Sequence, residues 1–115
     1  MNAATTAARP PQHMQALAHA NRVRLARAAL KREIGAGKRS APEVVLDSPW
    51  EVESMPLAEL LTSQRRWGRT RARKFLSVLG LNENKRVGTL TQRQRLLLAG
   101  ALEAKGRSRA AGLSS

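Results

Sequence analysis

Six positive charges fall within the ten residues 65–74, whose sequence is RRWGRTRARK. A glycine, Gly68, interrupts the run, and an amphipathic helical pattern begins directly after it. The first turn of a helix presents unpaired N–H groups and the positive end of the helix dipole, which together favour a bound anion. Positive side chains in that turn oppose the dipole, so they indicate an anion partner rather than a role in helix stability. The stretch predicts a phosphate site, with a solvated charged face as the alternative.

The hairpin around Gly68 is expected to carry most of this site. The glycine would permit either an unusual backbone conformation or a close approach that a Cβ would obstruct. Trp67 is expected to lie in the core or to form a lid, with base stacking as the alternative. We define the hairpin cluster as Arg66, Gly68, Arg69, Thr70, Arg71, Arg73 and Lys74.

Two further basic groups are candidates for phosphate contact. In the first, which we call the basic stripe, the residues have i, i+3, i+7 spacing on one face of a predicted helix. The second brackets the start of the last predicted helix. For both, an ordinary solvated face is the alternative. The basic stripe is Arg24, Arg27 and Lys31, and the second group is Arg86, Arg93 and Arg95, with Lys85 beside it.

The overall charge supports a polyanionic partner. The 115 residues carry a net charge of +13, and arginines outnumber lysines 16 to 5, which suits bidentate phosphate contact. Residues 41–64 hold five acidic and no basic residues, so the charge is segregated into basic, acidic and basic segments. The aromatic residues number three, too few for a membrane-bound amphipathic helix or a stacking platform for single strands. The composition therefore favours double-stranded nucleic acid.

Other chemistry finds little support in the residues. There is no cysteine, and the two histidines, His13 and His19, are not accompanied by carboxylates at ligand spacing. We therefore expect no metal, no cofactor and no enzymatic activity. No apolar run reaches the roughly 18 residues of a membrane span, and the N-terminus has no secretory signal pattern. The expectation is a cytoplasmic protein without a membrane partner.

The pattern of helix formers and helix breakers predicts an all-α chain. Residues 1–11 are predicted to be a disordered arm, 12–37 a long basic helix whose N-terminal half projects, 40–104 a compact helical domain, and 105–115 a basic disordered tail. Within the domain, helices are expected at 41–47, over the segment PLAELLTSQ, at 69–79, and from 92 onward. Ser40, Ser54 and Thr91 are the expected N-caps, and Gly80 the expected terminator.

Apolar residues at helical spacing predict the core of this domain. Trp50 is also expected to be buried. The predicted core residues are Leu57, Leu60, Leu61, Ala72, Phe75, Leu76, Leu79, Leu97, Leu98, Ala101 and Leu102.

The segments SAPEVVLDSPWEVESMPLAELLTSQRRWGRTRARKFLSVLGL and NKRVGTLTQRQRLLLAGALEA together resemble the integration host factor of actinobacteria, over roughly residues 15–104. The resemblance implies a long N-terminal helix followed by a helical bundle with a helix-two-turn-helix module, of the kind also found in small ribosomal proteins. It implies non-sequence-specific binding of double-stranded DNA, bending and compaction, nucleoid association and support of phage integrase complexes. We expect the protein to be a monomer in solution. It places Arg66, Gly68, Arg69, Thr70, Arg71 and Lys74 on the DNA-contact turn, and Arg86, Arg93 and Arg95 in a second basic cluster. The alternative function is RNA binding of the ribosomal type.

Overall fold

The computed structural model describes the backbone of residues 12–114 and the side chains of residues 12–106. The predicted arm over residues 1–11 lies outside the described residues. Across the described chain the elements are helical, and one isolated bridge pairs Pro56 with Arg86. The predicted all-α class is confirmed. In order, the elements are α2 (Gln12–Gly35), α3 (Ala41–Asp47), η1 (Trp50–Val52), α4 (Leu57–Thr62), α5 (Arg69–Val78), η2 (Val87–Thr89) and α6 (Gln92–Ser114).

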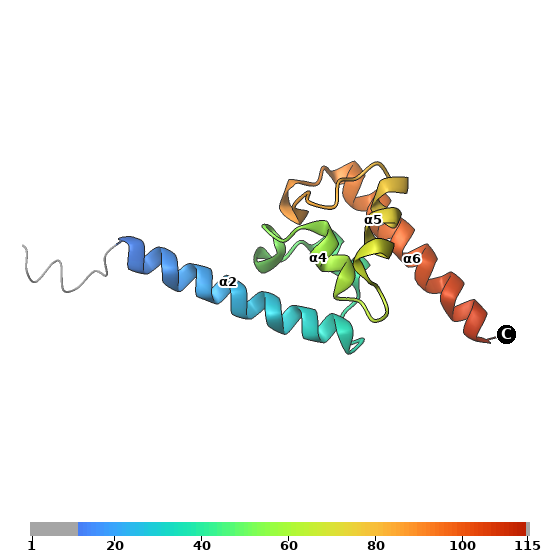
Figure 1. The fold of residues 1–115 in the computed structure, drawn as a ribbon, viewed down its shortest axis with the longest axis horizontal. Coiled ribbons are helices and arrows are strands. Elements are labelled where there is room, and N and C mark those ends of the chain that lie inside the picture. Colours follow the sequence, from blue (N-terminus) through green and yellow to red (C-terminus); the bar gives the residue numbers. More distant parts are fainter. Residues whose placement is uncertain (1–11, 115) are drawn as a thin grey trace, which may run out of the picture.

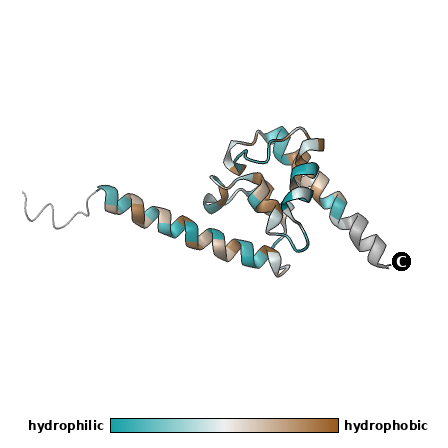
Figure 2. Cartoon of the chain, viewed as in Figure 1, coloured by the Kyte–Doolittle hydropathy of each residue, from teal (hydrophilic) through white to brown (hydrophobic). Residues whose placement is uncertain are grey.

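Helix α2 extends away from the compact body formed by α3, α4, α5 and the first part of α6, and the C-terminal part of α6 projects from the other side of that body (Figure 1). Residues 12–22 are all exposed, and burial in this helix is confined to its C-terminal half, at Leu30 and Ile34. Hydrophilic and hydrophobic residues are interspersed along its length, as Figure 2 shows. Its interior holds no proline or glycine, and Gly37, with φ of 79°, turns the chain after its end. The predicted projection of the N-terminal half is confirmed.

Two of the three predicted N-caps are present. The Ser40 hydroxyl accepts a hydrogen bond from the backbone N–H of Glu43, at 3.2 Å. At the start of α6, Thr91 Oγ1 accepts from the N–H of Gln94 at 3.1 Å, and Gln94 Oε1 accepts from the N–H of Thr91 at 2.9 Å. This reciprocal pair is a capping box, which satisfies two backbone donors at once.

The third predicted cap, Ser54, is wrong. Helix α4 has Pro56 as its N-cap residue, and its first N–H groups are satisfied by backbone carbonyls from residues 81–90, the link between α5 and α6. Leu57 N–H donates to the Lys85 carbonyl at 2.8 Å, and Ala58 N–H donates to the Glu83 carbonyl at 3.0 Å. Because this link supplies the acceptors, α4 needs no side-chain cap.

The link lies against residues 53–55 through a close backbone approach. Val87 N–H donates to the Met55 carbonyl at 3.0 Å, and Gly88 N–H donates to the Glu53 carbonyl at 2.9 Å. A Cβ at Gly88 would lie 2.8 Å from the Glu53 carbonyl oxygen, so this position requires glycine. Sequence reasoning placed an irregular segment here but did not predict this contact.

The core lies between α3, α4, α5 and α6, and it closes over the C-terminal half of α2. Trp67 is buried, with 8% of its surface exposed, as predicted. Two predictions are wrong, since Trp50 is 54% exposed and Leu97 is 49% exposed. In η1 the buried residue is Val52 instead of Trp50. In α6 the buried residues are Leu98, Ala99 and Leu102, on a helix that packs against α3. The predicted residues that are buried are Leu57, Leu60, Leu61, Ala72, Leu76, Leu98 and Leu102, while Phe75, Leu79 and Ala101 are partly buried.

Helix α6 is longer than the sequence pattern predicts. It runs to Ser114, so the prediction of a disordered tail from residue 105 is wrong for residues 105–114. No proline interrupts this stretch. Its alanine, arginine and leucine residues favour a helix enough to offset the low helix propensity of the isolated glycines.

Candidate nucleic-acid interface

The start of α5 lacks a side-chain cap. Gly68 is the N-cap residue, and its carbonyl accepts the first helical hydrogen bond, from Ala72 N–H at 3.1 Å. The N–H groups of residues 69–71 have no acceptor among the residues that the structure describes. By contrast, α3 and α6 begin with hydroxyl caps, and α4 is capped by the link. The start of α5 therefore presents free donors and the positive end of its dipole.

The role expected for Gly68 needs a correction. Its φ of −91° and ψ of 176° are ordinary extended values, which any residue adopts. The residue in the left-handed region is Arg66, with φ of 68°. A Cβ at Gly68 would meet no atom within 4 Å, so neither conformation nor internal packing requires glycine here. Of the two predicted reasons for a glycine at this position, the one that remains is that an external group approaches the backbone closely.

The cations of the hairpin cluster differ in how the fold uses them. The side chains of Arg66, Arg69 and Lys74 are exposed and make no hydrogen bond or ion pair within the described part of the chain. The guanidinium of Arg71 lies over the ring of Trp67, with Cζ 4.3 Å from the ring centroid. Sequence reasoning missed this stacking, in which Trp67 precedes α5 and Arg71 lies in its first turn.

Arg73 is the cation of the hairpin cluster that has an ion-pair partner. Its Nε lies 3.2 Å from Glu83 Oε2 in an exposed pair. Such a pair holds the side chain toward the link, and exposed pairs contribute little free energy. The guanidinium of Arg73 can therefore exchange this carboxylate for a phosphate at small cost.

The basic stripe does not form one free face. Arg27 donates from Nε to the Glu51 carbonyl at 3.1 Å and from its terminal nitrogen to the Ser54 hydroxyl. Lys31 pairs with Glu59, at 3.6 Å. These two residues therefore attach α2 to the body. The third member, Arg24, remains on the outer helix, where it donates to Asn21 Oδ1 at 2.9 Å.

The structure brings Arg27 and Arg86 together, although the sequence placed them in different groups. Arg86 donates from a guanidinium nitrogen to the Ser54 backbone carbonyl, while Arg27 reaches the hydroxyl of the same serine. Ser54, expected to cap a helix, is instead the acceptor that joins α2 to the link. This arrangement gathers two cations in a second basic region.

Arg93 and Arg95 both lie in the first turn of α6 but have different environments. Arg95 is half-buried and donates to the Val45 carbonyl at 3.1 Å, which fastens α6 to α3. Arg93 is exposed, and its side chain makes no hydrogen bond or ion pair with any described residue. Arg93 is therefore free to bind an external anion, while Arg95 has a structural contact.

Two other features are absent from the described residues. No three histidine or acidic residues there are grouped so that they could hold a metal ion. None of the described helices combines the length and the apolar composition needed to cross a membrane. The start of α5 can bind an anion through its unpaired N–H groups and the surrounding guanidinium and ammonium groups.

Comparison with known proteins gives one informative similarity. No protein-family model matches the chain, and no curated protein matches it. The fold is similar to that of a solved structure of sIHF bound to an 8 bp palindromic DNA, with a TM-score of 0.67 and 27% sequence identity. The match covers 73% of this chain and 97% of that one. The chain thus has an all-helical fold of the integration host factor type found in sIHF.

Proposed function

We propose that this protein binds duplex DNA through its phosphate backbone and acts as an architectural protein. The observation that carries the proposal is the uncapped start of α5, together with the side chains of Arg66, Arg69 and Lys74, which have no partner in the described chain. The similar structure of sIHF contains bound DNA, which supports the same partner for this chain.

In the proposed mode, a phosphate oxygen accepts hydrogen bonds from the N–H groups at residues 69–71. Arg66, Arg69 and Lys74 neutralise this phosphate and its neighbours and release the counterions condensed on the duplex. Thr70 adds a hydroxyl donor. Contacts of this kind fix the register of the protein on DNA but do not read base edges, so the binding carries little sequence preference.

The second basic region, at Arg27 and Arg86, gives the protein a way to deform DNA. A protein that contacts a duplex at two separated surfaces can hold it bent, with the deformation energy offset by the additional phosphate contacts. We therefore propose bending and compaction of DNA, nucleoid association and support of phage integration complexes. The resemblance to actinobacterial integration host factors supports these finer roles, and a monomer is the proposed binding unit.

We also propose that the protein changes DNA shape without chemical conversion. Among the described residues the candidate site gathers cations and backbone donors, which bind phosphate and do not supply an acid–base or metal pair. Incubation with intact and abasic duplexes should leave both uncleaved, and strand scission or base release would contradict this proposal.

The test is a salt titration of binding to a random-sequence duplex. Each neutralised phosphate contributes about 0.9 to the slope of log affinity against log salt concentration. Replacing Arg66, Arg69 and Lys74 together by Ala should reduce that slope by about 2 to 3. A control variant with Arg22, Arg32 and Lys38 replaced by Ala removes the same charge from other exposed positions. An equal loss in both variants would contradict the assignment.

An RNA duplex of the same sequence serves as the competitor. Preferential binding of DNA supports the proposal. RNA that competes equally or better would move the assignment to the alternative, an RNA-binding protein that recognises the 2′-hydroxyl groups of its partner.

A further inference from the structure

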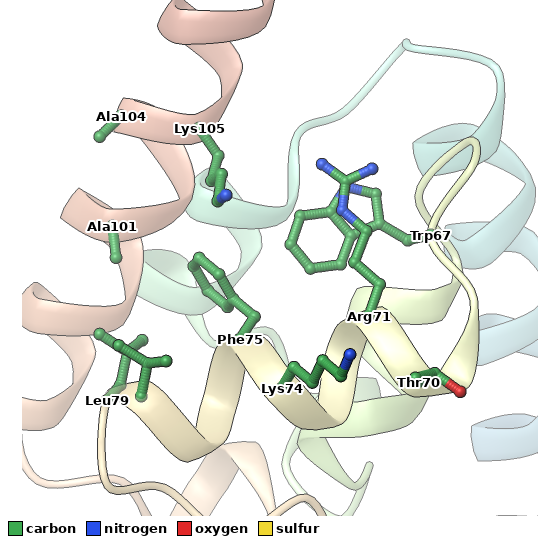
Figure 3. A pocket seen from close by; sticks show the side chains of 10 residues that line it. Trp67, Thr70, Arg71, Lys74, Phe75, Leu79, Ala101, Ala104 and Lys105 are labelled. Carbon is green, nitrogen blue, oxygen red and sulfur yellow. The ribbon is translucent and has the colours of Figure 1, made fainter.

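A cavity of about 890 Å³ lies between α5 and α6, beside the α5 start, and it shares Thr70, Arg71 and Lys74 with the hairpin cluster. Figure 3 shows Trp67 and Phe75 projecting from the α5 side toward the space that α6 borders. Their rings meet edge to face, with centroids 5.2 Å apart and an interplanar angle of 86°. Val78, 86% exposed, and the small side chain of Ala101 continue the apolar wall. The size and lining are those of a small-molecule site.

The charges around this cavity are all positive. Arg71, Lys74 and Lys105 line it, and no carboxylate of the described residues does. Arg71 covers one face of Trp67, while Lys105 reaches toward the cavity from α6 (Figure 3). Lys74 and Lys105 have no ion-pair partner among the described residues. An apolar wall bordered by unpaired cations is complementary to a molecule with an apolar body and a negative end.

We propose that this cavity binds a small amphiphilic carboxylate, with an aryl or medium-length alkyl body. The body would pack against Trp67, Phe75 and Val78, and the carboxylate would lie between the cations. A DNA phosphate fits the cations but leaves the apolar wall in contact with water. A second copy of the chain would have to offer an acidic element, while its projecting helix α2 is basic.

Occupancy of the cavity would also affect the proposed DNA interface, and this consequence rests on the proposed function. Arg71 and Lys74 line the cavity and also belong to the hairpin cluster. A carboxylate bound to them would compete with a DNA phosphate, and by linkage DNA would weaken carboxylate binding by the same factor. The cavity itself is tested without DNA, so its failure and the failure of the proposed function are distinguishable.

The fluorescence of Trp67 provides the direct test. Trp50 does not line the cavity, so Trp50→Phe leaves a single tryptophan as the reporter. Decanoate below its micelle concentration is titrated against this variant, with decyltrimethylammonium as the probe of equal chain length and opposite charge. We expect a saturable change in Trp67 emission with decanoate and none with the cation.

Variants in the same background locate the binding. Ala101→Phe places a ring in the cavity where the alkyl body would lie and should abolish the saturable change, with circular dichroism to verify that the helices are intact. Lys105→Gln should weaken decanoate binding by about tenfold, because it removes one charge-assisted contact. Lys38→Gln removes the same charge from an exposed position outside the cavity and should leave binding unchanged.

The outcomes decide the proposal. Anion-selective binding that Ala101→Phe abolishes and Lys105→Gln weakens supports a carboxylate site. No saturable change with decanoate overturns it, as does equal binding of the cation. Equal weakening by Lys105→Gln and Lys38→Gln also overturns it, since the anion would then be responding to the net charge alone.

Discussion

Substitution of Gly68 by Asp separates the stability of the fold from the binding of DNA. The backbone at this position is extended, and a new side chain meets no atom within 4 Å, so aspartate can be accommodated. Its carboxylate would accept from the free N–H groups of the first turn and would lie at the positive end of the α5 dipole. The helix would gain the cap that it lacks, while a carboxylate would occupy the position proposed for the phosphate.

Both effects have magnitudes that can be measured. Aspartate is a better N-cap than glycine, and with the dipole contribution we expect the free energy of unfolding to rise by about 0.5–1 kcal/mol. Two negative charges about 4 Å apart repel by about 4 kcal/mol at an effective dielectric constant of about 20. Salt and local rearrangement reduce this figure, so we expect DNA affinity to fall by at least tenfold, or about 1.4 kcal/mol.

The assay combines urea unfolding with DNA-binding titrations on the same preparations. Gly68→Asn supplies a cap without the charge, so it should stabilise the fold and weaken DNA binding less than aspartate does. Ser40→Asp changes the net charge equally at the N-cap of α3, and we expect it to leave affinity within about twofold. Unchanged DNA affinity in Gly68→Asp, or an equal loss in Ser40→Asp, would refute the assignment of the α5 start as the phosphate site.

Three further substitutions test the fold that positions this site. Gly88→Ala should lower the free energy of unfolding by about 1–3 kcal/mol, since its Cβ would meet the Glu53 carbonyl at 2.8 Å; unaltered urea unfolding would contradict this contact. Leu76→Ala should lower the free energy of unfolding, measured by thermal unfolding, by about 2–5 kcal/mol, because Leu76 is buried. Val78→Ser, at an exposed position, should lower it by less than about 0.5 kcal/mol, and similar losses in the two variants would argue against the described core. Arg27→Ala should speed amide hydrogen exchange in the C-terminal half of α2, because its hydrogen bonds attach that helix, and unchanged exchange would show that they do not.

Local signals in the sequence predicted the helices well. Ser40 and Thr91 were identifiable as caps because a hydroxyl followed three residues later by Glu or Gln is a local pattern. The spacing of Ala72 and Leu76 likewise indicated the buried face of α5, because helical periodicity depends only on neighbouring residues.

Features set by tertiary contacts were not predictable in the same way. Ser54 looks like a cap in sequence, but the link between α5 and α6 supplies the acceptors of α4 and leaves Ser54 to join Arg27 and Arg86. Trp50 was expected in the core, yet the short turn of η1 has room to bury Val52 and leaves the indole exposed. Both outcomes depend on segments that are distant in sequence.

The candidate site was predictable in position but not in its details. The charge density around Gly68 indicated the site at the start of α5. The division of the hairpin cations into free, stacked and ion-paired groups depends on where Trp67 and Glu83 lie in the fold. No local pattern indicates that Arg66, rather than Gly68, takes the left-handed conformation. The cavity between α5 and α6 depends on how the two helices pack, which a single sequence does not specify.

The most direct test of the central claim is a titration of the isotope-labelled protein with a short DNA duplex, followed through the backbone amide resonances. Hydrogen bonds from the α5 start to a phosphate predict the largest shifts at the amides of Arg69, Thr70 and Arg71, with Arg66 next. These shifts should disappear as salt concentration rises. Shifts concentrated instead on the projecting residues 12–22 of α2, with the α5 amides unchanged, would contradict the account.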